Sequence, residues 1–551
     1  MNFIRRHSIL TILITILIIG SVLRLYQLGQ QPLSLFADEV DAGYNAYSLI
    51  KTGRDYNDNF LPIHFKSNGD YRAFLFIWSL APQIAIFGLT PFAVRLGPAL
   101  WGIAGIPIIY LLTNQLTKSK VTALWSAFFL ALAPWHIHYS RAAFEITLMT
   151  SLMMLSTWLF LKSIKQPKLI VFTSVLFALN AYSYNVAKLY SPLLLVILVA
   201  VYWQQLKKLP HKLLITSLLT FVLCLLPLAY DSTLGAGSNR FNHINLVNHP
   251  AMEQTITNIR NTSPQPQSTL TKLMVNKYLY AGQDAINAYI QALSPVTQFV
   301  SGDSISARHS LPGFGFFYWW MAPLWIIGLI AIIRAWNQVS SRFLLIWLLT
   351  SPLASIITVN GGDHGTRLAT MIPPMVIITA IGTHQLYHYL TSKPFRIILS
   401  LGLTGLTLIT ITQYLYSYYT LYPAQAHIWW NYDITTAIKL SQQYRDQYQD
   451  IYINDSLTQL PFLYYAFYTQ YDPAALQQQF RDSQAGTAPK PQDQIGSVHF
   501  RTIYKDFLPD TPSLYITTNT GNLETWGTIQ EVKSPDPKDL LFMLVVQHYP
   551  S

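Results

Sequence analysis

Charged residues are scarce in this sequence. Only 11% of its 551 residues are charged and 51% are hydrophobic, whereas about 25% of the residues of a soluble domain carry a charge. Apolar runs recur as far as residue 419. This composition excludes an ordinary soluble domain over most of the chain and predicts a membrane protein.

Cysteine is almost absent as well. The single residue, Cys224, lies inside an apolar run, so an intrachain disulfide is excluded. The formal net charge of +11 would suit nucleic acid, but the Lys and Arg residues form short clusters between apolar runs instead of one basic face. We therefore expect no nucleic-acid partner and interpret the clusters as signals of membrane topology.

Twelve apolar segments are candidates for membrane spans. They are 8–26, 73–88, 92–116, 120–135, 143–161, 169–184, 188–204, 213–230, 315–334, 343–358, 367–390 and 397–419. A span needs about 20 mostly apolar residues, and cytoplasmic loops collect Lys and Arg. The basic clusters fall on one side only if segment 73–88, which is short and contains Pro82, lies on the membrane surface. We therefore predict about eleven spans and a cytoplasmic N-terminus.

This threading divides the chain into two predicted domains. Residues 1–419 form an all-α polytopic membrane module whose large outer loops are 27–91 and 231–314, and residues 420–551 form an extracytoplasmic domain. In the latter, 451–453, 514–517 and 541–546 have the composition of short strands, and 433–449 has the pattern of an amphipathic helix. We predict a small α/β domain there, and a location in the cell membrane for the whole chain.

The first outer loop opens with an adjacent carboxylate pair, Asp38 and Glu39. An ionised carboxylate can act as a general base, while a neighbouring carboxylate positions the nucleophile or raises the pKa of its partner. The alternative is a helix N-cap, because acidic residues at the start of a helix complement its dipole. The residues alone leave both roles open.

Two further outer loops carry isolated charges. Arg141 and Glu145 are four residues apart at the start of a predicted span, which fits either a structural ion pair or a functional site at membrane depth. Lys188 follows Tyr184 in a belt of tyrosines. The lysine either contacts a lipid phosphate or extends to the interface, where tyrosines are expected in any case.

The last two outer loops add cations and imidazoles. Arg308 and His309 precede one predicted span, and His364 and Arg367 precede another. Exposed amides at a helix start, together with Arg, suit an anion. Each loop is ordinary by itself, but all five polar loops lie on one side of the membrane. Together they predict a carboxylate base among several cations, which suits transfer from a lipid phosphate.

We predict neither a metal nor a cofactor. His136 and His138 have a spacing that metal ligands can have, but no third ligand accompanies them. A nucleotide phosphate loop of the form G-x-x-x-x-G-K-[ST] is absent from the sequence.

The motifs in this order resemble those of a known family. They are Asp38-Glu39, the segment 71–88 followed by Phe92-Ala93-Val94-Arg95-Leu96, Ser140-Arg141, Arg308-His309-Ser310-x-Pro312-Gly313 and His364-Gly365-x-Arg367. Over roughly residues 5–420 the sequence is similar to bacterial members of the dolichyl-phosphate-mannose protein mannosyltransferase superfamily. This superfamily also includes the lipid A aminoarabinose transferases and has the GT-C membrane fold.

The resemblance implies an inverting glycosyltransferase that uses a polyprenyl-phosphate-linked sugar, with Asp38 as catalytic base and Glu39 beside it. The candidate contacts to the donor phosphate or to the substrate are Arg95, Arg141, Glu145, Tyr184, Lys188, Arg308, His309, His364 and Arg367.

The acceptor stays open in this interpretation. The loop 231–314 is too short for the acceptor-recognition domain that eukaryotic protein mannosyltransferases carry, so a lipid, a glycan or a protein are all expected acceptors. The alternative function is a lipid-linked saccharide transporter or flippase, although transporters usually place ionisable residues near the membrane midplane and contain repeats. A sensor with a membrane anchor would not need so many spans.

Overall fold

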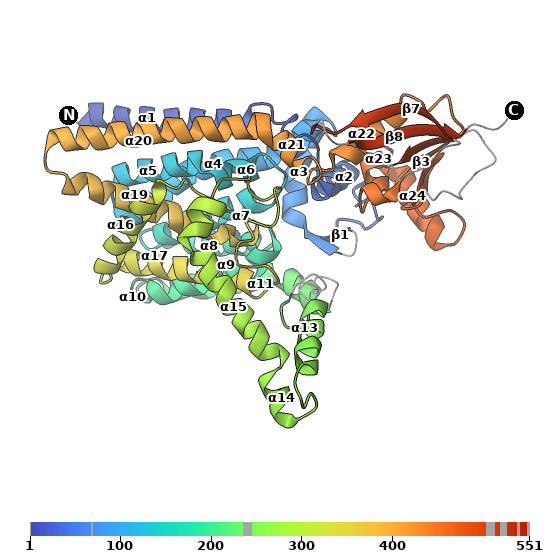
Figure 1. Cartoon of the computed structure of the whole chain (residues 1–551). Coiled ribbons are helices and arrows are strands. Elements are labelled where there is room, and N and C mark those ends of the chain that lie inside the picture. Colours follow the sequence, from blue (N-terminus) through green and yellow to red (C-terminus); the bar gives the residue numbers. More distant parts are fainter. Residues whose placement is uncertain are drawn as a thin grey trace.

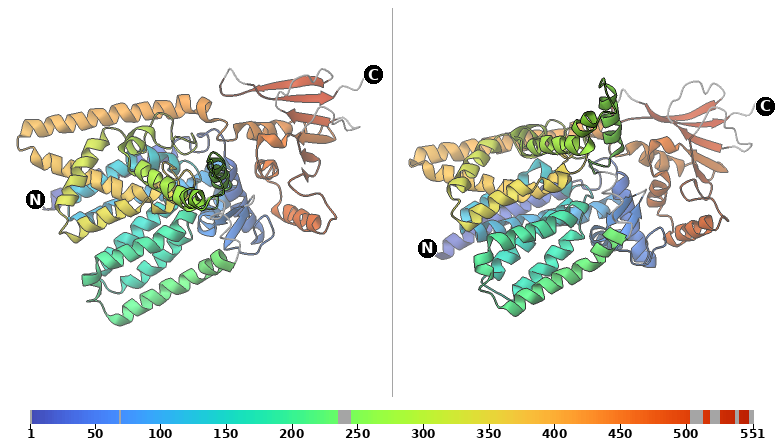
Figure 2. Two further views of the ribbon diagram at one scale, coloured as in Figure 1. Left: turned by 60° about the horizontal axis from the view of Figure 1, so that its bottom comes forward. Right: turned by 90° about the horizontal axis from the view of Figure 1, so that it is seen from below.

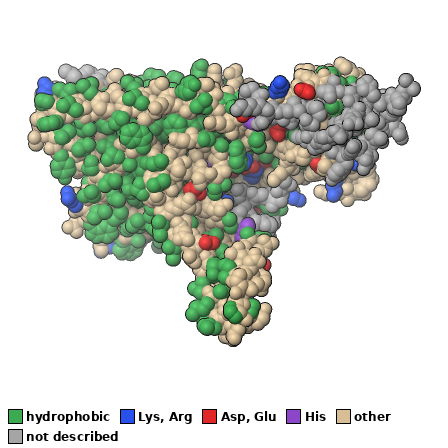
Figure 3. All heavy atoms as spheres, in the orientation of Figure 1, with side chains coloured by type: hydrophobic (Ala, Val, Ile, Leu, Met, Phe, Trp, Pro, Cys, Tyr) green, Lys and Arg blue, Asp and Glu red, His purple; other side chains and the backbone are tan. Residues whose placement is uncertain are grey.

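The computed structural model of the chain describes residues 2–67, 70–234, 245–502, 513–517, 526–536 and 540–547. A bundle of long helices occupies one end of the molecule and a mixed sheet the other, and α1 begins at the end of the bundle that is far from the sheet (Figure 1). Hydrophobic side chains cover much of the visible side of the bundle (Figure 3). A bundle with an apolar exterior is typical of a protein whose solvent is lipid.

The bundle contains the helices that follow from the apolar segments of the sequence. Their bounds are α1 Asn2–Leu25, α4 Pro91–Thr117, α5 Lys120–Leu132, α6 Pro134–Ser140, α7 Ile146–Ser163, α8 Leu169–Ala181, α9 Asn185–Val201, α10 Trp203–Leu206, α11 His211–Leu234, α16 Met321–Arg334, α17 Val339–Thr350, α18 Leu353–Ile356, the 3-10 helix η3 Arg367–Met371, α19 Ile372–Tyr389 and α20 Lys393–Tyr416.

Six of the helical segments in the described part of the chain are long and apolar enough to cross a membrane. They are Ser8–Leu25, Pro91–Thr117, Ile146–Ser163, His211–Asp231, Val339–Ile356 and Lys393–Ala426. The pair α5 and α6, bent by 58°, would be a seventh, and α3, α8, α9 and α16 are shorter apolar helices. The predicted mostly helical membrane fold is thus confirmed, while the count of about eleven spans stays a prediction.

The bend between α5 and α6 has an identifiable cause. Pro134 has no N–H to donate to the carbonyl of Leu130, and the N–H of Trp135 donates to Phe316 O at 3.1 Å. The buried guanidinium of Arg24, on α1, donates to the carbonyls of Leu130 and Ala131 at 3.2 and 3.0 Å. Arg24 therefore satisfies the two carbonyls that the break leaves without an intrahelical partner.

The first loop contains α2 (Ala37–Thr52), the hairpin of β1 (His64–Ser67) and β2 (Asp70–Ala73), and α3 (Phe74–Phe87). α3 contains Pro82 and packs against α2 and α4. It corresponds to segment 73–88, whose predicted position on the membrane surface stays a prediction.

The second large loop is also largely helical. It contains α13 (Pro250–Asn261), α14 (Thr269–Met274), α15 (Lys277–Leu293) and the π-helix η2 (Thr297–Ser301). The first three form an arm that projects from the side of the bundle (Figure 1).

The C-terminal region combines helices with a six-stranded sheet. Its elements are the π-helix η4 Ser417–Leu421, α21 Tyr422–Ala426, α22 Tyr432–Ser441, β3 Asp450–Ile453, η5 Asp455–Leu457, α23 Pro461–Tyr468, α24 Pro473–Gln484, β4 Gln494–Ile495, β5 Val498–Phe500, β6 Ser513–Thr517, β7 Trp526–Lys533 and β8 Leu540–Gln547. The strand order is β4-β5-β3-β6-β8-β7, with β3 parallel to β5 and β6. β3, β6 and β8 lie where the sequence predicts strands, whereas β4, β5 and β7 were not predicted. The helix α22 ends earlier than the predicted helix. The domain boundary at residues 419 and 420 stays a prediction.

The C-terminal region packs directly on the first loop. One hydrophobic cluster contains residues of α2 and α3 together with residues of α22, α23 and the sheet. Tyr464 donates to Leu35 O at 3.0 Å, and Tyr44 donates to Tyr471 O at 2.9 Å. Both views in Figure 2 show the first loop between the bundle and the C-terminal region. The region around Asp38 therefore lies between the two parts of the molecule.

Candidate active site

Asp38 and Glu39 stand at the start of α2 but have different surroundings. The side chain of Asp38 is 42% exposed and forms an ion pair with Arg72, with Oδ1 2.6 Å from Nη2. Arg72 also pairs with buried Asp41, whose Oδ2 lies 2.5 Å from Nε. One arginine of strand β2 thus fixes the exposed carboxylate relative to α2.

The charges around Arg72 hold it in its ionised form. Burial would lower the pKa of Arg72, but the charges of Asp38, Asp41 and Glu145 and the hydrogen bond to Asp38 raise this pKa well above its usual value. Burial raises the pKa of Asp41, and the charge of Arg72 and the hydrogen bond from Tyr56 offset that effect only in part. Arg72 therefore stays positively charged beside Asp38 and Asp41. The sequence patterns did not single out this residue.

Glu39, by contrast, is fully buried and its carboxylate is fully engaged. Arg95, also buried, donates to Oε1 from Nε at 2.9 Å and to Oε2 from Nη2 at 3.0 Å. The backbone N–H groups of Ala143 and Phe36 donate to the same carboxylate at 2.7 and 3.2 Å. This pair joins α2, α4 and the segment before α7, which is a structural arrangement.

Arg95 has further partners in the first loop. Its Nη1 donates to Pro32 O at 2.7 Å, and its Nη2 donates to Ser34 O at 2.5 Å. All of its terminal nitrogens thus have protein acceptors, and the side chain is not accessible.

Arg141 is buried in the same way. It donates to Leu23 O at 3.1 Å and to Gln31 O at 3.2 Å, and its guanidinium lies 5.1 Å from the ring centre of Tyr418. Glu145 stands directly before α7 without a side-chain capping hydrogen bond, and its charge helps to raise the pKa of Arg72. A structural ion pair between Arg141 and Glu145 stays a prediction.

Arg308 differs from these two arginines. It is half-buried, and its guanidinium lies 4.9 Å from the ring centre of Phe36, two residues before Asp38. Phe36 also packs against Phe144, with ring centres 4.8 Å apart. The structure thus brings the cation of the fourth outer loop to the start of α2, where the carboxylate pair stands.

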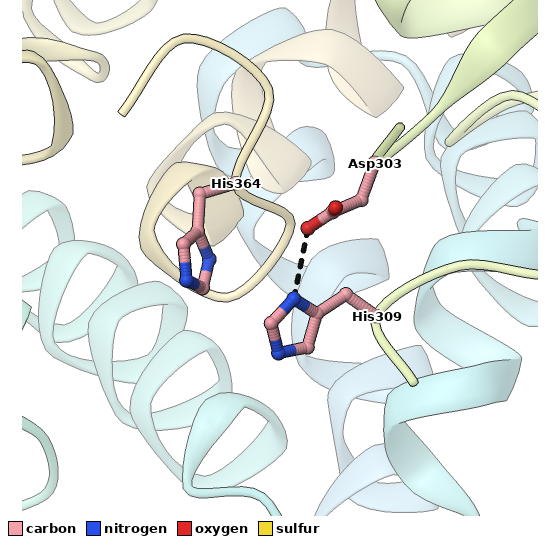
Figure 4. A group of neighbouring side chains, drawn as sticks. All are labelled: Asp303, His309 and His364. Atoms are coloured by element: carbon pink, nitrogen blue, oxygen red, sulfur yellow. Dashed lines mark hydrogen bonds and ion pairs between the residues drawn. The ribbon is translucent and has the colours of Figure 1, made fainter. Parts of the chain in front are cut away.

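His309 and His364 come together with Asp303, as Figure 4 shows. The Nδ1 of His309 lies 2.9 Å from Asp303 Oδ2, and the two imidazole centres are 4.6 Å apart. Burial would raise the pKa of Asp303, but the hydrogen bond and charge of His309 and the N–H of Gly365 lower it below its usual value. Asp303 is thus an ionised partner of His309.

The same three side chains could hold a metal ion. One ligand atom from each residue lies within 4.8 Å of the others, and two imidazoles with a carboxylate form a donor set that transition metals accept. No spacing rule joins residue 303 to residue 364, so the sequence could not reveal this group. The predicted absence of an essential metal stays a prediction.

Lys188 belongs to a separate polar chain. Its Nζ lies 3.1 Å from Nε2 of His64, and Nδ1 of His64 lies 2.7 Å from a carboxylate oxygen of Asp231. Burial and the charge of Lys188 lower the pKa of His64 to about 4, although the charge of Asp231 opposes them. His64 and Asp231 line a cavity of about 880 Å³ that also includes Tyr71, the neighbour of Arg72.

Tyr184 and Arg367 complete the predicted set. Tyr184 is buried at the start of α9. Arg367 donates from Nη1 to Thr358 Oγ1 at 2.8 Å and to Val359 O at 2.7 Å, so it holds its own loop.

The comparisons with known proteins concern the family and the fold. Residues 71–230 match the family described as dolichyl-phosphate-mannose-protein mannosyltransferase. The fold is similar to that of ArnT from Cupriavidus metallidurans bound to undecaprenyl phosphate, at 12% identity and a TM-score of 0.51, with 97% of each chain covered. The chain has a GT-C fold. The resemblance that the sequence motifs indicate is therefore confirmed.

A second GT-C structure, the apo oligosaccharyltransferase of Archaeoglobus fulgidus, is 13% identical with a TM-score of 0.49. The comparison covers 85% of this chain, which spans 64% of the length of that chain. No curated protein matches the sequence. At these identities the structural similarity shows the GT-C fold alone, and the site must be argued from its own residues.

Proposed function

We propose that this chain is a membrane glycosyltransferase that transfers a sugar from a polyprenyl-phosphate-linked donor to a lipid, glycan or protein acceptor, with inversion. The reaction would take place on the extracytoplasmic face of the cell membrane, on the side to which the predicted threading assigns the outer loops and the C-terminal domain. The family match over residues 71–230 and the GT-C fold support this class of enzyme.

The observation that carries the proposal is the contrast between the two adjacent carboxylates. Asp38 is 42% exposed and held in place by Arg72, whereas Glu39 is inaccessible and engaged with Arg95. A general base has to reach the hydroxyl or amine that it deprotonates. We therefore assign the base to Asp38 and a positioning role to Glu39.

Arg308 is the cation best suited to the departing phosphate. Its guanidinium packs against Phe36 and is only half-buried, so it can still reach a substrate. Arg95 and Arg141 are buried and donate to backbone carbonyls. We therefore assign phosphate binding to Arg308 and supporting roles to the other two arginines.

The proposed reaction is a single displacement. Asp38 accepts the proton of the acceptor group, the acceptor oxygen or nitrogen bonds to the anomeric carbon, and the bond from that carbon to the phosphate oxygen breaks. The polyprenyl phosphate leaves with the electron pair, and Arg308 stabilises its negative charge. Attack opposite to the leaving group inverts the anomeric centre.

The remaining candidate residues have supporting roles around Asp38 and Arg308 in this proposal. Glu145 supports Arg72 electrostatically. His309 packs against Phe144, with ring centres 5.9 Å apart, which places the Asp303, His309 and His364 group beside Arg308. A metal bound by that group would supply positive charge near the phosphate. Tyr184, Lys188 and Arg367 remain candidate contacts to the lipid-linked substrate.

The test is a deletion strain complemented with wild type or with Asp38→Asn, followed by mass spectrometry of envelope lipids and proteins. Wild type should restore one sugar modification, and Asp38→Asn should reduce it at least about 100-fold, the lower range for loss of a general base. Asp58→Asn is the matched control, because Asp58 of the first loop also pairs with two arginines, Arg54 and Arg481.

Full restoration by Asp38→Asn would overturn the proposed mechanism. The transporter alternative makes a different prediction, since purified protein in liposomes would move a lipid-linked saccharide across the bilayer without forming a new glycosidic bond.

A further inference from the structure

The arm formed by α13, α14 and α15 projects from the side of the bundle. It extends across the direction of α1 and α20 and leaves the bundle in the half nearer the C-terminal region (Figures 1 and 2). An arm that runs across the spans at their outer ends extends along the membrane surface, because the spans themselves cross the bilayer.

The arm has a small core of its own. Leu246, Met252 and Ile256 pack with Ala281 of α15, so α13 is held against α15. Arg260 donates from Nε to Val275 O at 2.8 Å, which ties the end of α13 to the turn before α15. The arm is therefore a defined structural element whose first set of apolar side chains is already buried.

A second set of apolar side chains on the arm is exposed. Each of these residues is 55% to 65% exposed, and they are Leu270, Leu273, Met274, Leu279, Ile286 and Ile290. In α15 the spacings from Leu279 to Ile286 and to Ile290 place the three side chains on one stripe of the helix. Within the described residues nothing covers this stripe.

The exposed stripe has a consistent direction. Figure 3 shows the hydrophobic side chains of the arm gathered mainly on the side that faces along the bundle toward its N-terminal end, whereas the opposite side is largely polar. This is the side on which lipid surrounds the spans. The apolar surface of the arm thus adjoins the apolar surface of the bundle, and the two surfaces lie at an angle to each other.

The residues next to the stripe are those found at membrane interfaces. Lys272 is exposed, and the ammonium group of Lys277 lies 5.6 Å from the ring centre of exposed Tyr278. Tyrosine prefers the level of the lipid headgroups, and lysine can reach their phosphates while its stem stays in apolar surroundings. The arm therefore has the composition of a helical element that lies in the plane of the interface.

We propose that the α13, α14 and α15 arm binds the lipid surface, with Leu273, Leu279, Ile286 and Ile290 inserted among the acyl chains. The occupant of the stripe is the leaflet at the end of the bundle that carries the candidate active site. Lipid is favoured over a second copy of the chain because the stripe faces along the spans, where lipid already contacts the bundle.

The arm is covalently close to the site. α15 leads through η2 to Asp303, and Tyr289 of α15 donates to Leu349 O of α17 at 2.8 Å. A lipid-bound arm would thus fix the height of the Asp303 to Arg308 loop relative to the headgroups. The proposal itself concerns binding to lipid and does not depend on the chemistry of the site.

The experiment places one spin label on each variant, which requires a chain with a single cysteine. Because Cys224 is the one cysteine of the sequence, a single substitution removes the native thiol. In a Cys224→Ala background, Leu273→Cys and Ile286→Cys variants of the full chain carry a nitroxide label and are reconstituted into liposomes. Gln254→Cys, an exposed polar position on α13, is the matched control. Electron paramagnetic resonance measures the collision rates of each label with oxygen and with a water-soluble nickel complex.

We expect the ratio of oxygen to nickel collisions to be severalfold higher at positions 273 and 286 than at position 254. Equal ratios at all three positions would overturn the proposal. Short label-to-label distances between copies that persist at high lipid dilution would assign the stripe to a second copy instead. Ile290→Cys replaces Ile286→Cys if that variant does not fold.

Discussion

Replacing Glu39 by Gln removes one charge from the most enclosed ion pair of the candidate site. Both Glu39 and Arg95 are inaccessible, and the carboxylate accepts hydrogen bonds from Arg95, Ala143 and Phe36. The variant leaves the Arg95 cation without its counter-charge. It also places an amide NH₂ group opposite N–H donors, because a Gln side chain has only one acceptor oxygen.

The expected cost follows from burial. Removing one partner of a buried ion pair costs about 3–5 kcal/mol, since the remaining charge stays out of water. Replacing Asp38 should cost less, because its side chain is 42% exposed to water and Arg72 keeps Asp41 as a counter-charge. Glu39→Gln should therefore lower the Tm of the purified protein by about 3–4 °C, whereas Asp38→Asn should change it little.

The assay is thermal unfolding in detergent, followed by the loss of the monodisperse peak in size-exclusion chromatography. Sugar transfer is measured on the same samples below both melting temperatures. Asp38→Asn should be stable and inactive, and Glu39→Gln should be unstable with part of its activity retained at low temperature. A Glu39→Gln protein as stable as wild type, or an Asp38→Asn protein that melts several degrees lower, would refute the assignment of the two carboxylates.

Three further predictions concern the surrounding network. Arg24→Met should lower the Tm by several degrees, because the carbonyls of Leu130 and Ala131 lose their donors at about 1–3 kcal/mol each. Arg54→Met, at a side chain that is 43% exposed, serves as the control in the same assay. The pKa of His64 is lowered to about 4 in the folded protein from its ordinary value of 6.5. The unfolded chain therefore binds the proton first as the pH falls. The free energy of unfolding should decrease between pH 6.5 and 4 by up to about 3 kcal/mol. His64→Gln should flatten that part of the curve of Tm against pH, and an unchanged slope would contradict the assignment. Zinc should raise the Tm of wild type more than that of His364→Ala, because a bound ligand stabilises the folded state by about 2.7 kcal/mol when its concentration is 100 times Kd. Equal shifts of Tm in both proteins would mean that Asp303, His309 and His364 bind no zinc and only form hydrogen bonds.

Hydropathy and charge in the sequence were sufficient to predict the membrane fold and the places of its helices. Each of the eleven predicted segments overlaps a helix, the bent α5 and α6 pair, or two consecutive helices such as α17 and α18, while the number of spans stays a prediction. This success has a physical reason, because a bilayer requires long apolar segments whose backbone groups are satisfied within the segment itself. The motif at Asp38 was equally visible, since adjacent carboxylates near a membrane surface are unusual at the level of local sequence.

Only the tertiary structure decided what the residues of the site do. Asp38 and Glu39 are neighbours in the sequence, yet one is exposed beside Arg72 and the other is buried with Arg95, which belongs to another helix. The helical turn at the start of α2 directs the two side chains differently, and packing against α4 and the C-terminal region determines which direction is inaccessible. No local pattern encodes such long-range contacts. The sequence therefore determined that this chain crosses a membrane and carries a carboxylate motif, while packing determined which carboxylate is accessible.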